Sequence, residues 1–158
     1  MTLIKKLQQA IDALGTFHDA PRTVDVSEGA RRMTCELRGL DRLACQLRVL
    51  RLQTPELAAA SRDRLQAISE SLSSRLTYLL EPVSLIEIDS EGCTVQLRSN
   101  PPRQEDNGRA CYYELLVRRG GEINLCRYRA GDGDREIVPA KLTREVLGRL
   151  AADFSAVL

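Results

Sequence analysis

The sequence predicts an α+β protein with two layers, in which an antiparallel sheet built from hairpins has helices packed on one face. Two observations lead to this fold class. Stretches of alternating apolar and polar residues occur in pairs separated by turn-forming residues, as in β-hairpins. Apolar residues recur at helical spacing at both ends of the chain and once in its middle. The predicted order of elements is α-β-β-α-β-β-β-β-α.

Length and composition indicate a single α+β domain spanning residues 1–158. Hydrophobic residues make up 43% and charged residues 28%, which is typical of a globular chain. The formal net charge of +1 argues against capture of nucleic acid or of a membrane by overall charge, but it permits a local basic patch. No stretch is apolar for long enough to act as a signal peptide or to cross a bilayer, so we predict no membrane contact.

The five cysteines indicate a reducing compartment. They are Cys35, Cys45, Cys93, Cys111 and Cys126. Their number is odd, and they form neither a CxxC pair nor a cluster with histidine, so the sequence supports neither a disulfide framework nor a zinc site. Each one lies in an alternating apolar pattern, where a thiol acts as a small buried hydrophobe. We therefore predict a cytoplasmic protein.

The first helix is predicted near the N-terminus, where Ile4, Leu7, Ile11 and Leu14 recur at helical spacing and Gly15 follows as a stop. Residues 15–30 are rich in turn formers and are predicted to form a loop.

Residues 31–52 fit either one helix or two strands. A helix would align Leu40, Leu43, Leu47 and Leu50. Two strands are favoured because a three-residue loop at 39–41 would place apolar residues opposite one another. The expected pairs are Leu37 with Leu43, Cys35 with Cys45, and Met33 with Leu47.

Residues 54–80 predict the clearest helix. Thr54 suits the N-cap, Pro55 suits the first turn, and Pro82 follows the end. The helix would be long for so small a domain, which is consistent with a dimer interface or with a scaffold helix under the sheet.

The second half of the chain predicts two hairpins and a last helix. Residues 83–98 form a hairpin that turns at Glu91-Gly92, with Ile86 and Ile88 on the face that carries Cys93, Val95 and Leu97. Residues 99–109 are a polar loop. After the hairpin over 110–130, residues 131–136 form a turn, Ile137 and Val138 form a short edge strand, and Thr143 caps the final helix.

The hairpin over 110–130 carries the candidate binding residues. A two-residue turn at Gly120-Gly121 would place Tyr113, Tyr128, Leu115 and Cys126 on the core side. The other side would then mix apolar residues with arginines, a composition typical of protein interfaces. The interface residues predicted in this way are Leu116, Arg118, Ile123, Leu125, Arg127 and Arg129. A segment of the same chain could instead cover this side.

An alternative is that the same face binds single-stranded nucleic acid or another anionic ligand. Tyr112, Arg118, Arg127 and Arg129 would make that site. Tyr112 is the sole aromatic residue expected on that face, and Glu114 adds a negative charge there, so the pattern is of low specificity.

Catalytic signals are weak. His18 is the only histidine and lies in a predicted loop, and there is no phosphate-binding glycine motif. The alternating carboxylates of 87–91 and of 132–136 are more typical of a solvated strand and a turn than of a metal site. The sequence predicts no catalytic residues, no cofactor and no metal, and an enzyme is the least favoured reading.

We therefore predict a non-catalytic, cytoplasmic protein-interaction or assembly module that forms a homodimer. No sequence motif identifies a family. The predicted order of elements resembles that of small dimeric α+β chaperones of secretion effectors, which is a likeness of architecture alone.

Overall fold

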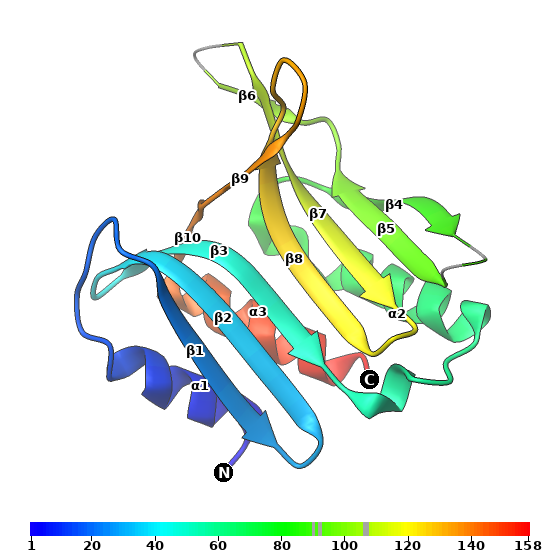
Figure 1. The fold of residues 1–158 in the computed structure, drawn as a ribbon, viewed down its shortest axis with the longest axis horizontal. Helices are drawn as coiled ribbons and strands as arrows, with labels where there is room; N and C mark the ends of the chain where they lie inside the picture. The colour runs from blue at the N-terminus through cyan, green and yellow to red at the C-terminus, as the bar shows by residue number, and fades with distance from the viewer. Residues whose placement is uncertain (90, 92, 106–107) are drawn as a thin grey trace.

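The computed structural model describes residues 1–89, 91, 93–105 and 108–158, and it confirms the α+β fold with an antiparallel sheet. Three helices lie behind the sheet in Figure 1. They are α1 (Leu3–Asp12), α2 (Arg62–Arg75) and α3 (Arg144–Ala156). Among the described residues no helix lies on the other face, so one face of the sheet is open.

The sheet has ten strands, and every pairing is antiparallel. Its main path runs β1-β2-β3-β8-β7-β5-β4. The strands are β1 (Arg22–Glu28), β2 (Arg31–Leu40), β3 (Ala44–Gln53), β4 (Val83–Asp89), β5 (Thr94–Ser99), β6 (Arg103–Gln104), β7 (Ala110–Arg118), β8 (Glu122–Arg129), β9 (Glu136–Val138) and β10 (Ala140–Thr143).

The sheet divides between β3 and β8. The two strands pair from Gln53 with Glu122 to Val49 with Cys126 and then diverge. Beyond that point β9 pairs with β8, and β10 pairs with β3. Pro139 lies between these two short strands. The chain therefore passes from β9, beside β8, to β10, beside β3, and so connects the two arms of the divided sheet. We call this place the fork.

Residues 15–30 are not a loop throughout, because they include β1. Val24 and Val26 of β1 lie opposite Cys35 and Met33 of β2, with their side chains on the helix side. Helix α1 lies along this edge of the sheet, where Lys6 Nζ donates to the carbonyl of Ser27 at 2.6 Å. Contacts with β2 and α1 stabilise β1. The strand itself contributes two apolar residues, and so few are a weak sequence signal for a strand.

Residues 31–52 are two strands, as the favoured alternative predicts, but their register differs from the prediction. Leu37 lies opposite Leu47, Cys35 opposite Leu50, and Met33 opposite Leu52. The turn falls at 41–43 rather than 39–41 because the Asp41 carboxylate accepts from the backbone N–H groups of residues 43 and 44, both at 2.8 Å.

The long helix predicted over 54–80 is wrong, since the segment contains three separate pieces. A 3₁₀ turn at Pro55–Leu57 comes first, α2 begins after Ser61, and a second 3₁₀ turn covers Thr77–Leu79. The Ser61 hydroxyl accepts from the backbone N–H of Arg64 at 3.1 Å, which makes it a new N-cap. Leu80 follows the last turn in the left-handed conformation, with φ of 65°.

The hairpin predicted over 83–98 is confirmed in β4 and β5, although part of its predicted turn, Gly92, lies outside the described residues. A register shift between Leu85 and Glu87 leaves Ile86 as an extra residue in β4. Ile86 is therefore exposed rather than on the core face, which corrects the prediction. The loop predicted over 99–109 includes the short strand β6, which pairs with β7.

The core lies between the sheet and the three helices, and Phe154, Leu72 and Leu50 are among its fully buried side chains. All five cysteines are buried. Burial raises the pKa of Cys45 to about 11 and raises that of Cys35 further, so both thiols stay protonated and act as apolar residues. In the described part of the chain no helix has both the length and the apolarity to cross a membrane.

Candidate functional site

The turn of the β7–β8 hairpin has three residues rather than two. Arg118 pairs with Glu122, so Arg119, Gly120 and Gly121 form the loop. Gly121 has φ of 101°, and a Cβ atom at this position would lie 2.4 Å from the carbonyl oxygen of Thr54. The backbone N–H of Thr54 donates to the carbonyl of Gly121 at 2.8 Å, which fixes the loop against the segment after β3.

The added loop residue shifts the register by one and exchanges the faces of β8 relative to β7. Val117 now lies opposite Ile123, and Leu115 lies opposite Leu125. All four side chains are buried in the core. Ile123 and Leu125 are therefore covered by the helices of their own chain, which corrects their assignment to an exposed interface.

The remaining interface residues lie on two different faces. Leu116 and Arg118 are on the open face, and Leu116 is partly exposed there. Arg127 lies beside Tyr113 on the helix side, and Arg129 shares that side two residues further along β8. The four arginine and tyrosine residues of the anionic-ligand alternative are divided in the same way, so the structure does not bring them together.

Of the three tyrosines in this hairpin, Tyr128 lies on the face opposite to the predicted one. Tyr128 lies opposite Tyr112 on the open face, with ring centroids 6.0 Å apart, whereas Tyr113 alone enters the core. Arg98 stacks on the ring of Tyr112 at 4.4 Å, and Arg135 stacks on that of Tyr128 at 3.7 Å. These guanidinium groups occupy the ring faces that a nucleobase would need for stacking.

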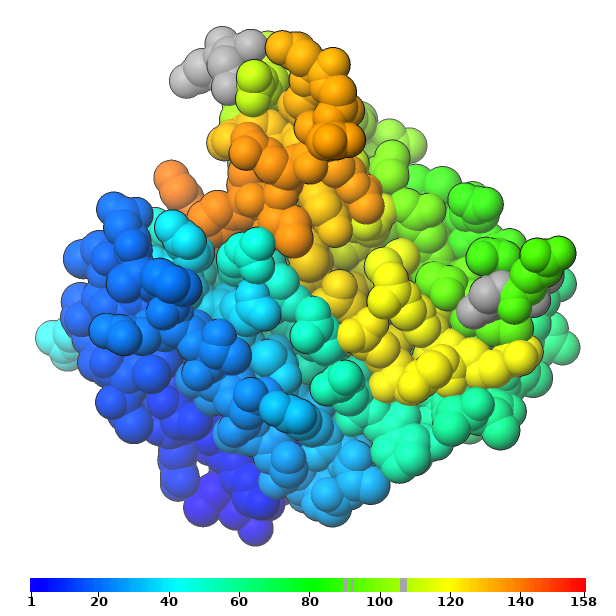
Figure 2. Space-filling model, viewed as in Figure 1, coloured from blue at the N-terminus to red at the C-terminus, as the bar shows by residue number. Residues whose placement is uncertain are grey.

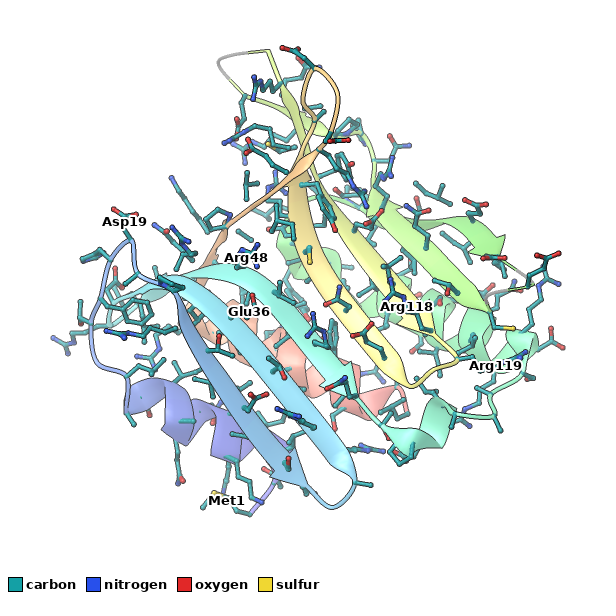
Figure 3. All side chains as sticks on the ribbon, in the orientation of Figure 1. Met1, Asp19, Glu36, Arg48, Arg118 and Arg119 are labelled. Carbon is teal, nitrogen blue, oxygen red and sulfur yellow. The ribbon has the colours of Figure 1, made fainter. Side chains whose placement is uncertain are left out.

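Ion pairs between the side chains of neighbouring strands extend across the open face. Figure 2 shows this face, and Figure 3 shows the side chains that project from it, including Glu36, Arg48 and Arg118. Arg48 Nη1 lies 3.0 Å from Glu36 Oε2, and Glu122 lies between Arg51 and Arg118, at 2.8 Å and 2.9 Å. Because its arginines are neutralised by carboxylates, this face offers little free positive charge to a polyanion.

Glu114 is the most enclosed carboxylate of this face, although no helix covers it. Arg135 binds it through two N–H groups, at 2.8 Å and 2.9 Å, and Gln96 donates a further hydrogen bond. Burial raises the pKa of this carboxyl, but the hydrogen bonds from Arg135 and Gln96 and the charge of Arg98 outweigh burial, so the pKa falls below its usual range.

The fork of the sheet holds a cleft of about 640 Å³, on the side where Arg127 and Arg129 lie. Its cationic side chains come from β6, β8 and β10: Arg103, Arg127, Arg129 and Lys141. Two carboxylates, Glu81 and Glu105, also line it. Arg127 and Arg129 were among the predicted binding residues, but they were expected on the opposite face of the sheet.

Arg127 and Arg129 are held in place by the two carboxylates of the cleft. Arg127 Nη1 lies 2.9 Å from Glu81 Oε2, and only about an eighth of each side chain is exposed. Arg129 binds Glu105 at 2.9 Å and Glu136 at 3.1 Å. Arg127 also stacks on the ring of Tyr113 at 4.6 Å, and burial is the main cause of the raised pKa of that phenol.

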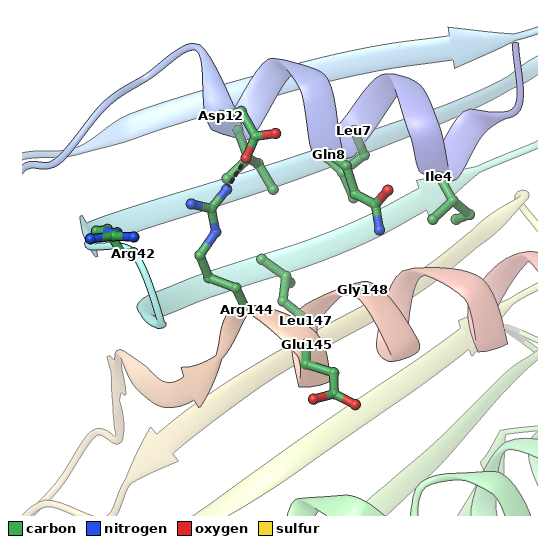
Figure 4. Close-up of a pocket in the computed structure, with 10 residues that line it drawn as sticks. Ile4, Leu7, Gln8, Asp12, Arg42, Arg144, Glu145, Leu147 and Gly148 are labelled. Carbon is green, nitrogen blue, oxygen red and sulfur yellow. Dashed lines mark hydrogen bonds and ion pairs between the residues drawn. The ribbon is translucent and has the colours of Figure 1, made fainter.

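A second hollow of about 420 Å³ lies between α1 and α3 (Figure 4). Ile4, Leu7 and Leu147 line it, and the ion pair between Arg144 and Asp12 crosses one end. The ion pair ties the two helices together, so this hollow is explained as part of the helix layer.

The outer edge of β4 carries two neighbouring exposed aliphatic residues. In the described chain no strand pairs with the outer edge of β4, and Leu85 and Ile86 of this strand are 36% and 49% exposed. Leu85 lies opposite Leu97 on the helix side, whereas the extra residue Ile86 leaves that face. The sequence analysis missed this edge because it placed Ile86 in the core.

The residues considered for chemistry do not converge. His18 is exposed and lines neither the cleft in the fork nor the hollow between α1 and α3. Within the described residues no group of three His, Cys, Asp or Glu side chains has a metal-binding arrangement. In the segment 132–136, Arg135 turns to Glu114 and Glu136 pairs with Arg129.

Comparison with known proteins adds no identification. No protein family model matches the chain, and neither a curated protein nor a solved structure matches it.

Proposed function

We propose that the protein is a non-catalytic protein-interaction module that self-associates as a homodimer through the free edge of β4. The observation that carries this proposal is the pair of exposed aliphatic residues, Leu85 and Ile86, on a strand whose outer edge has no partner in the described chain. An edge strand presents unpaired backbone N–H and C=O groups, so it is a template for another strand.

The two edges of the sheet differ in a way that favours a closed dimer. At the β1 edge, α1 binds the strand through Lys6 and Ser27 and through the Glu28 carboxylate, which accepts from the backbone N–H of Leu3. At the β4 edge the hydrogen bond from a helix lies at the start of the strand, where the Ser73 hydroxyl of α2 donates to the carbonyl of Val83. One available edge leads to a two-fold pair of β4 strands, whereas two available edges would lead to an open chain of molecules.

Charge supports an antiparallel pairing centred on Ile86. In that register Glu87 lies opposite Leu85 of the second copy, and Asp89 lies opposite Val83. Like charges then do not face each other, and the two Ile86 side chains meet at the centre. The two sheets would form one continuous sheet.

The proposal is tested by sedimentation of the wild type and of Ile86→Lys. We expect the wild type at micromolar concentrations to have twice the 17.6 kDa mass of the chain, and the variant to have the mass of one chain. The lysine places two positive charges opposite each other at the centre of the interface and leaves the monomer folded, because Ile86 lies outside the core.

Leu43→Lys is the matched control, since Leu43 is 79% exposed in the β2–β3 turn, far along the sheet from β4. It should remain dimeric. A monomeric wild type, or a dimer that persists in folded Ile86→Lys, would refute the proposal.

The cytoplasmic location predicted from the cysteines remains part of this proposal. Buried thiols outside any disulfide, such as those of Cys35 and Cys45, support a reducing compartment, because an oxidising compartment favours disulfides in small domains.

A further inference from the structure

We infer that the cleft in the fork is a binding site for a small organic anion, a carboxylate or phosphate group attached to an apolar body. This inference uses none of the β4 residues and is independent of the self-association proposed above. It rests on the size of the cleft, its unpaired cations, its apolar lining and a strained residue at its rim.

The cleft has the size of a ligand pocket. Its volume of about 640 Å³ lies within the range of roughly 300–1,000 Å³ that is usual for sites of small molecules. It exists because β9 and β10 diverge at Pro139, so the two arms of the sheet leave a space that the segment 78–81 closes from the helix side. A single continuous sheet would have no such opening.

Within the described residues, two cations of the cleft form no ion pair. Arg127 and Arg129 are bound to Glu81 and Glu105, whereas in the described part of the chain neither Arg103 nor Lys141 has a carboxylate within ion-pair distance. The bound pairs keep Glu81 and Glu105 from neutralising the other two cations. Arg103 belongs to β6 and Lys141 to β10, so the positive charge of these two residues comes from both arms of the fork.

The remaining lining is largely apolar and aromatic. It includes Leu79, Leu80, Val138, Leu142, Val146, Tyr78 and Tyr113. A mainly apolar wall with a few converging polar groups is typical of a site that takes an organic ligand rather than a free inorganic ion. The body of the ligand would contact this wall while its anionic group meets Arg103 and Lys141.

Leu80 at the rim supports a role in binding. Its backbone has φ of 65°, a conformation that is unfavourable for a leucine, and the residue is 89% exposed. A large apolar side chain held by a strained backbone in solvent gains contacts when an apolar ligand enters beside it. The left-handed conformation lies at the C-cap of the 3₁₀ turn Thr77–Leu79, and it directs the Leu80 side chain to the rim.

Backbone amide NMR spectra can test the site with three probes of one shape: 1-naphthoate, 1-naphthyl phosphate and the uncharged 1-naphthamide. We expect at least one anion to shift the amide signals of Tyr113, Arg127 and Lys141, with the amide probe binding at least tenfold more weakly. The anion that binds more tightly shows whether the natural ligand carries a carboxylate or a phosphate.

The double variant Arg103→Gln with Lys141→Gln should weaken anion binding by about tenfold or more, since it removes both positive charges that would meet the anionic group. Lys5→Gln with Arg62→Gln is the control; both residues are exposed and outside the cleft, and affinity should be unchanged.

Four results would overturn the inference. They are no shift with either anion at millimolar concentration, equal binding of 1-naphthamide, unchanged affinity in the Arg103→Gln and Lys141→Gln variant, and tighter binding of an oligothymidylate at the same amides. The last result would indicate a nucleic-acid site instead.

Discussion

At the scale of single residues, the open face is explained by pairing between charges. Glu114 and Glu122 each receive more than one basic partner, and both carboxylates come from strands at the centre of the sheet. The sequence showed these arginines and glutamates but not their partners. Arg135 lies in the turn after β8, and only the folded chain brings it back to Glu114.

Glu114 should make stability depend on pH in the acid range. Its folded pKa lies below the ordinary value of 4.5, so its favourable contribution is complete above pH 4.5 and is lost as pH falls toward the folded pKa. Glu114→Gln removes this contribution and leaves Arg135 without its charged partner. We expect the free energy of unfolding of the variant to be about 1–3 kcal/mol lower at pH 7, with the difference shrinking below pH 4.

Urea unfolding at pH 7 and pH 3 measures this effect, and Glu91→Gln, at an exposed position, is the control. An equal loss of stability at both pH values would mean that Glu114 acts through packing rather than through its charge.

At the scale of elements, the type of most elements could be predicted and the registers could not. Alternation in 31–52 and 83–98 correctly indicated strands, since one face of each is buried. The register of the 110–130 hairpin depends on whether its loop has two or three residues. Backbone hydrogen bonds from this loop to Thr54 and Cys93, which lie elsewhere in the chain, stabilise the three-residue loop. The long predicted helix failed because Ser61 caps a new helix inside an apparently continuous apolar pattern.

The two glycines of the β7–β8 loop provide a direct test of the three-residue turn. Gly121→Ala should lower the free energy of unfolding by about 2–4 kcal/mol, because φ is positive and the new methyl group would meet the Thr54 carbonyl at 2.4 Å. Gly120→Ala should change it by less than about 0.5 kcal/mol, since nothing lies within 4 Å of the added atom. Thermal or urea unfolding distinguishes the two. Similar values for both variants would contradict the loop assigned here.

At the scale of the whole molecule, a sheet with one covered face and one open face has three surfaces for contact: the open face, the fork and the free edge. Ion pairs neutralise the open face, and the fork suits a small anion. The β4 edge is the surface suited to another protein chain, because aliphatic side chains and unpaired backbone groups occur together there. The sequence could not place this surface, since the extra residue in β4 that exposes Ile86 has no local sequence signal.

Hydrogen–deuterium exchange at two protein concentrations tests the β4 edge most directly. If two copies pair there, the backbone N–H groups of Val83–Asp89 that face away from β5 gain hydrogen bonds, so exchange of this segment slows as concentration rises. Exchange of Arg22–Glu28 at the opposite edge should stay the same. Exchange at β4 that is independent of concentration, or slowing at β1 or across the open face instead, would contradict a dimer formed through this strand.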